Sequence, residues 1–144
     1  MIKKLLLVLS MCLVLSAETE FAEPEPSLVD PRLIVFSINT ADDETIHHVL
    51  SVANNVIKFY GPDNVYIRIV AYYHGIKMVE KKHRKIAVRV DALGLLGVEF
   101  VACGNTMRTK KIKEEDLTEY AEVVTAGIVE ITERVQAGWV YIAP

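Results

Sequence analysis

A lone cysteine at the end of an apolar run has the most reactive side chain in the central part of the sequence. Cys103 closes the run "VEFVAC" and is followed directly by Gly104, Asn105 and Thr106. The thiolate is the nucleophilic form of cysteine, and nearby backbone N–H groups or cations favour it. Gly104 lets the chain turn with little steric cost. The pattern fits a reactive thiol. A buried structural cysteine is the alternative, because free cysteine is among the most buried residue types.

The histidines are the other side chains suited to acid–base or metal chemistry. His74 follows the run "IVAYY" and could orient a substrate or help to deprotonate a thiol, although an ordinary loop histidine fits as well. His47 and His48 are neighbours, and neighbouring residues on a helix point about 100° apart, so they cannot easily share a metal. Because no spacing matches a zinc site and no glycine pattern matches a nucleotide loop, we predict no metal and no cofactor.

Apolar runs and helical patterns alternate along the chain and must position these residues. We expect strands over residues 32–40, 65–73, 98–103, 123–125 and 139–144. We expect helices over 41–61, 83–97, 113–122 and 126–138, a loop or short helix over 74–82, and a loop over 104–112. This order predicts a three-layer, flavodoxin-like α/β fold, in which a mostly parallel five-stranded sheet has helices on both faces.

Parallel strands bring their carboxyl ends to one edge of a sheet, and open α/β sheets bind ligands there. Polar or flexible residues follow the first four expected strands at this edge, and Gly127 is among those that follow the fourth. We therefore predict Cys103 as the catalytic residue. The binding residues that we predict around it are Asn39, His74, Gly75, Gly104, Asn105 and Thr106.

The start of the chain has the pattern of a secretory signal peptide, which we assign to residues 1–22. Two lysines precede the apolar run Leu5–Leu15, and small residues follow it. We predict cleavage near Ala17 or Ala22, and a periplasmic or secreted protein. The apolar run is short for a bilayer span, so we expect no stable membrane span after processing.

Export changes the cysteine count. A lipoprotein acylated at Cys12 is the less favoured alternative to simple cleavage. With the signal peptide removed, Cys103 is the sole cysteine and can form no internal disulfide, which suggests a free reactive thiol or an intermolecular bond. Residues 23–31 are acidic and contain proline, and we predict a disordered lead-in there, followed by one domain over 32–144.

The charge and composition favour a globular domain without nucleic acid as a partner. The chain is 51% hydrophobic and 24% charged, which supports a substantial core. Its net charge is -3, and we found no basic stripe of the kind that nucleic-acid-binding domains carry.

Five stretches together resemble the DsrE/DsrF-like family, and the likeness covers about residues 32–144. They are "VFSIN", "ANNVIKFYG", "IVAYYHG", "GVEFVACGNTM" and "VVTAGIVEITERVQAGWVYIAP". The resemblance, which is closest to exported or single-domain members, implies a flavodoxin-like domain that assembles into trimers or hexamers. Some members carry sulfur as a cysteine persulfide in relay pathways, and their active cysteine lies after the third strand, where Cys103 lies here.

Two functions follow as hypotheses. The first is a sulfur carrier or sulfurtransferase-like protein that holds sulfane sulfur as a persulfide on Cys103, with sulfur donor and acceptor proteins as partners. The second is a non-catalytic homo-oligomer that binds a small ligand or has a structural role, with Cys103 packed at an interface or pocket. The export signal departs from the cytoplasmic relay proteins, so their usual partners do not carry over.

Overall fold

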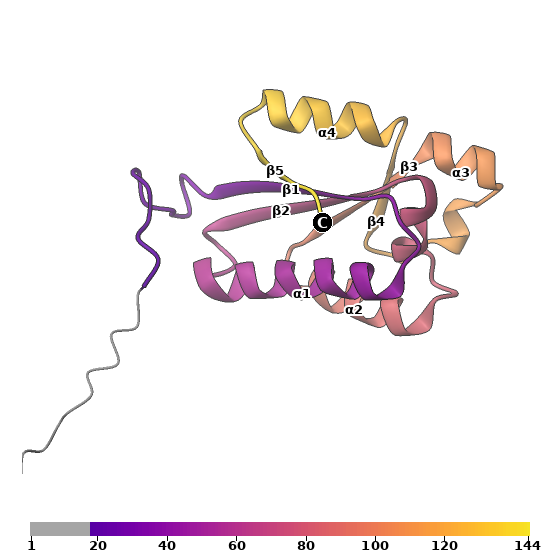
Figure 1. Cartoon of the computed structure of the whole chain (residues 1–144), viewed down its shortest axis with the longest axis horizontal. Helices are drawn as coiled ribbons and strands as arrows, with labels where there is room; N and C mark the ends of the chain where they lie inside the picture. The colour runs from indigo at the N-terminus through magenta and orange to yellow at the C-terminus, as the bar shows by residue number, and fades with distance from the viewer. Residues whose placement is uncertain (1–17) are drawn as a thin grey trace, which may run out of the picture.

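A five-stranded sheet forms the middle layer of the structure, a computed structural model that describes residues 18–144 (Figure 1). The strands are β1 (Arg32–Ile38), β2 (Val65–Ala71), β3 (Glu99–Cys103), β4 (Ala121–Val124) and β5 (Val140–Ile142). Each pair of neighbouring strands runs parallel, in the order β4-β3-β2-β1-β5. The first four strands therefore add to one side of the sheet in turn, and β5 returns to the other side of β1.

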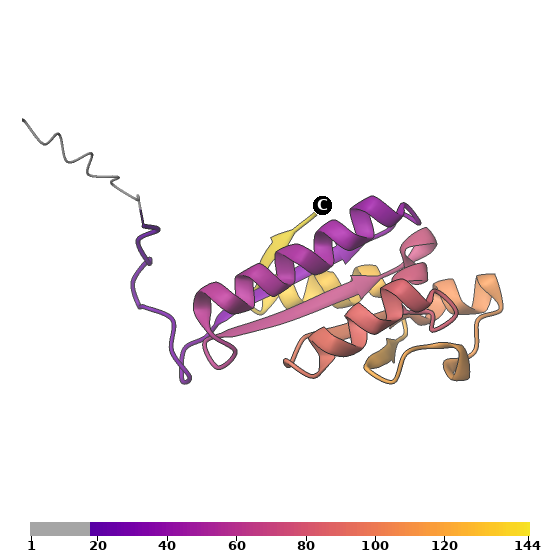
Figure 2. The same cartoon turned by 90° about the horizontal axis from the view of Figure 1, so that it is seen from below.

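Helices cover both faces of this sheet, which confirms the predicted three-layer α/β fold. The helices α1 (Asp43–Tyr60) and α2 (Arg84–Gly94) lie side by side under one face (Figures 1 and 2). The helix α4 (Gly127–Gln136) covers the opposite face. The short helix α3 (Gly104–Lys110) follows β3 at the carboxyl edge of the sheet, near the 3-10 helix η1 (Tyr73–Val79) that follows β2.

Alternating strand side chains divide the core into two parts of unequal size. The larger part lies against α1 and α2 and includes the fully buried Phe36, Ile69 and Phe100. Removal of such a side chain from water contributes about 1.5–3 kcal/mol. The smaller part consists of Val35, Val70, Val101 and Ile131 under α4. Because α4 alone covers this face, the sheet is much less deeply buried there.

The helix α1 begins and ends where its sequence provides caps. The Asp42 carboxylate accepts a hydrogen bond from the Thr45 N–H at 2.7 Å, which satisfies a free donor of the first turn. Gly61 has a positive φ of 85° and donates its N–H to the Ile57 carbonyl at 2.8 Å. The predicted apolar face is confirmed, since Ile46, Val49, Leu50, Ala53 and Ile57 are all buried and Tyr60 packs against the same core.

Two predicted elements after Cys103 were wrong. The segment predicted as a loop over 104–112 contains α3, and the segment predicted as a helix over 113–122 contains only a 3-10 turn, η2 (Glu114–Asp116). The Asp116 carboxylate caps this turn by accepting from the Lys113 N–H at 2.9 Å. From Ala121 onward the chain pairs with β3 as an edge strand. The hydrogen bonds of this strand pairing outweigh the local helix propensity of these residues. The helix predicted over 83–97 ends at Gly94.

A charged cluster continues the α4 face beyond the small core. The Arg68 side chain on β2 is 12% exposed and forms ion pairs with Glu99 on β3, Glu122 on β4 and, at 2.7 Å, Glu130 on α4. Arg134 on α4 also pairs with Glu130, at 3.1 Å. Ionic contacts across three strands and a helix thus replace apolar packing over part of this face.

The segment before β1 contacts the domain at the end of α1. The Phe21 ring packs edge-on against Phe59 with ring centroids 5.6 Å apart, and Arg32 donates to the Ala22 carbonyl at 2.6 Å. Residues 1–17 of the predicted signal peptide, which include its Ala17 cleavage site and Cys12, lie outside the described residues. None of the helices within residues 18–144 has the length and apolar character needed to cross a bilayer.

Candidate functional site

Cys103 lies where the carboxyl ends of β3 and β4 meet. It is the last residue of β3, is paired in register with Val124 of β4, and precedes the first residue of α3. Alternation along β3 directs its side chain to the α4 face, on the same side as Val101. The residue is 6% exposed, so the thiol is covered, but it lies at the rim of the sheet and outside both apolar core clusters.

The first residue of α4 closes over the sulfur. The Gly127 N–H donates to the Cys103 Sγ at 3.2 Å, although 24 residues separate the two in sequence. A Cβ at position 127 would lie 3.2 Å from the Cys103 Cβ and 3.2 Å from the Val70 Cγ1. Glycine therefore lets the start of α4 approach the thiol closely enough to form this hydrogen bond.

Several donors converge on Cys103 and change its acidity. Burial by itself raises the pKa of the Cys103 thiol. The hydrogen bond from the Gly127 N–H opposes the effect of burial, the polar groups of Thr106 and Asn105 beside the sulfur act in the same direction, and the net effect lowers the pKa of the thiol. A lowered pKa increases the thiolate fraction at neutral pH, and the thiolate is the nucleophile. The site therefore favours the reactive form of this cysteine.

Thr106 also fixes the neighbouring segment η1. The Tyr73 N–H donates to the Thr106 Oγ1 at 2.9 Å, so the chain leaving β2 is held against α3. Tyr73 adopts a positive φ of 51°, which is uncommon for an aromatic residue and marks a sharp change of chain direction. The Asn105 N–H donates to the Thr125 carbonyl at 3.1 Å and links α3 to the chain that leaves β4.

A shallow pocket of about 230 Å³ lies beside the thiol. Its lining comes from η1 and α3 and consists of Tyr73, Asn105, Thr106, Thr109 and Lys110. Cys103 does not line it, but Asn105 and Thr106, which help to lower the pKa of its thiol, do. The pocket and the surroundings of the thiol therefore share the first turn of α3.

His74 borders this region without contacting the thiol. Its Nδ1 accepts a hydrogen bond from the Lys110 Nζ at 3.2 Å, because an ammonium group can only donate. The His74 ring also packs on Tyr73 with centroids 3.9 Å apart. Within residues 18–144 the structure shows no hydrogen bond between His74 and Cys103, so His74 is not placed to deprotonate the sulfur directly.

The three remaining predicted residues support the site indirectly. A Cβ at Gly75 would lie 2.0 Å from the Ile38 carbonyl oxygen, and a Cβ at Gly104 would lie 2.8 Å from the Val124 carbonyl oxygen. Both glycines therefore permit close backbone packing at the carboxyl edge. Asn39 is exposed, and its Nδ2 lies 3.5 Å from the Tyr72 hydroxyl, so it belongs to the edge but not to the thiol environment.

The predicted binding residues did not include Gly127 and Tyr73. The rule of carboxyl ends places both at strand ends, but it does not show that Gly127 contacts the thiol. The hydrogen bond from Gly127 to sulfur depends on how α4 crosses the sheet.

Among residues 18–144, no group of three or more His, Cys, Asp or Glu side chains is arranged to hold a metal ion.

Comparisons with known proteins agree with this fold. The family model described as "DsrE/DsrF-like family" matches residues 33–144. A protein of unknown function from Methanobacterium thermoautotrophicum, MTH1491, is 32% identical, with a TM-score of 0.74 over 80% of this chain and 100% of its own. The YchN protein from E. coli is 16% identical, with a TM-score of 0.69 over 78% of this chain and 99% of its own, and supports the fold. No curated protein matches the chain.

Proposed function

The chain belongs to the DsrE/DsrF-like family, and from this premise we propose that it carries sulfane sulfur as a persulfide on Cys103. The family suggests a role related to sulfur relay. The observation that supports a carrier is the environment of the thiol, in which the Gly127 N–H lies 3.2 Å from the Cys103 Sγ and further donors from Asn105 and Thr106 lower the thiol pKa. This environment favours a nucleophile and stabilises negative charge on sulfur.

The transfer step needs no oxidant or reductant. The Cys103 thiolate attacks the outer sulfur of a donor persulfide, R–S–SH, and forms a new S–S bond. The S–S bond of the donor breaks, and its electron pair leaves with the inner sulfur as R–S⁻, which solvent can protonate. Cys103 then holds –S–SH, and attack of an acceptor thiolate on that outer sulfur releases the Cys103 thiolate again.

The local geometry gives each donor a role in this exchange. Gly127, Asn105 and Thr106 would stabilise the thiolate before attack and again when it leaves. The pocket lined by Tyr73, Thr109 and Lys110 lies beside the thiol and offers a space in which a donor or acceptor can bind. Because the thiol is 6% exposed, a modest opening at the rim must accompany sulfur transfer. We propose that the donor and acceptor are proteins with exposed thiols.

Mass spectrometry of the native full chain tests the proposal. The protein is incubated with inorganic polysulfide, and the peptide that contains Cys103 is analysed with and without dithiothreitol. We expect an increase of about 32 Da, one sulfur atom, that dithiothreitol removes. The Cys103→Ser variant should show no such increase. An unmodified Cys103 peptide, in protein whose thiol still reacts with iodoacetamide, would count against a carrier.

A second function, a non-catalytic homo-oligomer, is favoured by a separate observation. Apolar side chains on α4 and β5 are well exposed: Ile128 56%, Val129 58%, Val140 59% and Tyr141 46%. The two elements are in contact, and exposed apolar side chains that gather on neighbouring elements are typical of interaction sites. We propose that these residues join copies of the chain into a trimer or hexamer. Light scattering should show assembly in the wild-type protein and its loss in Val129→Glu, and a monomeric wild-type protein would contradict it.

A further inference from the structure

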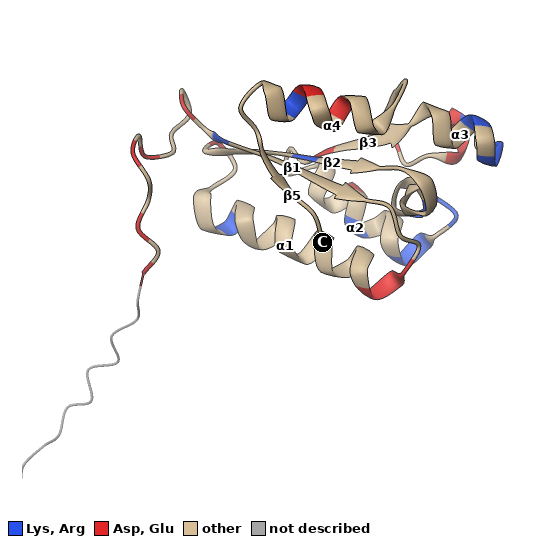
Figure 3. Cartoon of the chain, turned by 45° about the horizontal axis from the view of Figure 1, so that its top comes forward, with Lys and Arg blue, Asp and Glu red and all other residues tan. Residues whose placement is uncertain are grey.

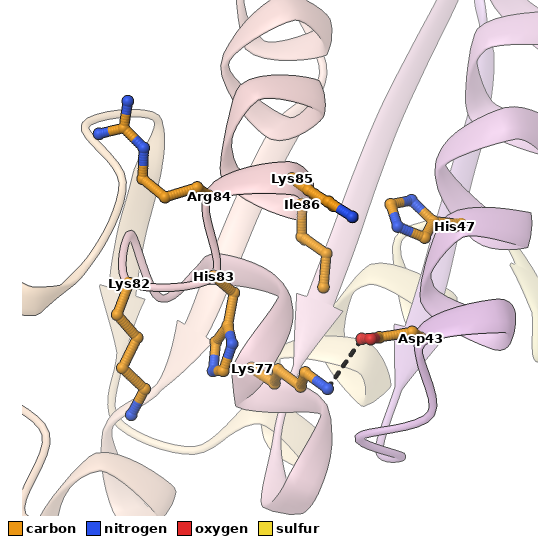
Figure 4. Close-up of a pocket in the computed structure, with 8 residues that line it drawn as sticks. All are labelled: Asp43, His47, Lys77, Lys82, His83, Arg84, Lys85 and Ile86. Carbon is orange, nitrogen blue, oxygen red and sulfur yellow. Dashed lines mark ion pairs between the residues drawn. The ribbon is translucent and has the colours of Figure 1, made fainter.

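A second pocket, on the α1 and α2 side of the sheet, has a strongly basic lining. It measures about 250 Å³ and lies between the start of α1, the end of η1 and the start of α2 (Figure 4). Its cationic residues are Lys77, Lys82, Arg84 and Lys85. It shares no lining residue with the pocket beside Cys103, so the two are separate candidate sites.

The charge of this basic pocket is opposite to that of the chain. Four cations against the single lining carboxylate, Asp43, leave a net charge of +3, whereas the whole chain carries -3. Figure 3 shows the basic residues of the segment before α2 close to the acidic first turn of α1. Local positive charge on an acidic protein attracts anions to one position and repels them elsewhere on the surface.

Only part of this positive charge is neutralised by neighbouring carboxylates. Lys77 pairs with Asp43 at 2.7 Å, and Lys82 pairs with the buried Glu80 at 2.6 Å. Within residues 18–144, neither Arg84 nor Lys85 forms a salt bridge. Lys85 extends from α2 toward the side of α1 that carries His47 (Figure 4). Lys85 thus brings an unpaired positive charge to the pocket, whereas the Arg84 side chain points away from His47 and Lys77 in Figure 4 and lies at the margin of the pocket.

The positive charges of Arg84 and Lys85 destabilise the start of α2 when no ligand is bound. Arg84 and Lys85 occupy the first turn of α2, at the positive end of the helix dipole, and this turn contains no acidic residue. The residue before it, His83, makes no capping hydrogen bond with its side chain. By contrast, α1 has Asp42 as a cap and acidic residues in its first turn. A bound anion would offset the repulsion at the start of α2.

His47 adds a directional donor to the pocket. Its Nδ1 contacts the Arg89 guanidinium at 2.8 Å, and a guanidinium group can only donate, so Nδ1 accepts. The proton of the neutral ring therefore lies on Nε2. Arg89 also donates to the Ser51 hydroxyl at 2.9 Å, which helps to fix the arrangement of α1 against α2. The imidazole is thereby held in one orientation at the wall of the pocket.

We propose that this pocket binds a small oxyanion with two or more negative charges, of the phosphate or sulfate type. Lysine, arginine and imidazole N–H groups all form charge-assisted hydrogen bonds with tetrahedral oxyanions. The volume of about 250 Å³ is below the range of about 300–1,000 Å³ that is common for drug-sized ligands. Inorganic pyrophosphate or a small phosphorylated molecule suits it better than a dinucleotide.

Calorimetric titration of the full chain tests this site. Pyrophosphate, phosphate, thiosulfate and sulfate are titrated separately at constant ionic strength. The variants are Lys85→Gln and Arg84→Gln/Lys85→Gln, and the matched control is Lys58→Gln, an exposed lysine in the last turn of α1. We expect saturable binding of one anion per chain, a Kd that rises about tenfold for Lys85→Gln and somewhat further for the double variant, and no change in the control.

The unliganded protein gives a second readout. Loss of positive charge at the start of α2 should raise the melting temperature of the free protein while it reduces the stabilisation caused by pyrophosphate. Tighter binding of pyrophosphate than of thiosulfate would identify a phosphorylated ligand, and the reverse order a sulfur oxyanion. Absence of saturable binding by any of the four anions, or equal loss in Lys58→Gln, would overturn the proposal.

Discussion

The Gly127 N–H lies 3.2 Å from the Cys103 Sγ and joins the start of α4 to the end of β3. This contact brings a backbone donor from one side of the sheet onto a thiol at its carboxyl edge. With Asn105 and Thr106 on the other side, it lowers the pKa of a thiol that burial alone would make less acidic. The reactivity proposed for Cys103 depends on this balance.

The alkylation rate of Cys103 should show the lowered pKa directly. Because iodoacetamide reacts with the thiolate, a plot of rate against pH has its midpoint at the thiol pKa. We expect this midpoint to lie below the value of about 8.5 that is typical of a free cysteine. The unfolded protein in urea serves as the control and should titrate at the ordinary value.

The same pKa difference should make stability depend on pH. Between the folded and unfolded pKa values, the unfolded chain binds more protons at Cys103, so the free energy of unfolding rises with pH. The contribution is complete above about pH 8.5 and is lost as pH falls through the lowered folded value. Urea unfolding of the wild type and Cys103→Ser should show a difference that grows with pH. A constant difference would contradict the lowered pKa.

A matched pair of threonine variants should separate the role of Thr106 from a general effect on α3. Thr106→Val removes a donor to Cys103 and the acceptor of the Tyr73 N–H, whereas Thr109→Val removes only the bond to the Asn105 carbonyl. We expect Thr106→Val to raise the thiol pKa and to slow alkylation at neutral pH. Thr109→Val should match the wild type. Equal effects of both variants would assign the change to helix stability.

Gly75 should be far less tolerant of alanine than Gly97. A Cβ at Gly75 would meet the Ile38 carbonyl oxygen at 2.0 Å, and backbone atoms cannot yield by that much. We expect Gly75→Ala to lower the free energy of unfolding by about 3 kcal/mol or more. Gly97 has a positive φ of 90° but no atom near its Cβ position, so Gly97→Ala should cost only about 1–2 kcal/mol. Urea unfolding measures both.

Removal of Arg68 should leave three carboxylates in mutual repulsion on the α4 face. Because Glu99 and Glu122 are half exposed, we expect Arg68→Ala to cost about 2–3 kcal/mol, less than a fully buried pair. Adding Glu130→Gln to that variant should recover part of the loss. Lys113→Ala, which breaks an exposed pair with Glu115, should change stability by no more than about 0.5 kcal/mol. If Arg68→Ala and Arg68→Ala/Glu130→Gln lose the same free energy of unfolding, repulsion between the carboxylates is not the cause.

The sequence was sufficient to predict the alternation of strands and helices, because apolar runs and three-to-four spacing are local properties. It failed at α3, since a seven-residue helix that begins with Gly104 and Asn105 has only Met107 as a buried apolar side chain in its middle. It also failed over 113–122, where a charged turn and pairing of Ala121 with Phe100 replace the expected helix.

The sequence could predict which residues of the candidate site lie at strand ends, but not how they contact one another. The place of Cys103 followed from the end of an apolar run, but the Gly127 hydrogen bond requires α4 to cross the sheet. The basic pocket was not predicted, because it also depends on how separate elements pack. Residues 81–85 were divided between an expected loop and an expected helix, and their approach to Lys77 and His47 is a property of the fold.

The rate of sulfur uptake by native and unfolded protein tests the central claim most directly. Full-length wild-type protein, with and without urea, is mixed with a limited amount of polysulfide at about pH 7, and the 32 Da adduct on the Cys103 peptide is followed over time by mass spectrometry. We predict faster uptake by the native protein, because the folded site favours the thiolate. Slower uptake by the native protein, or none, would contradict the assignment of Cys103 as a sulfur carrier.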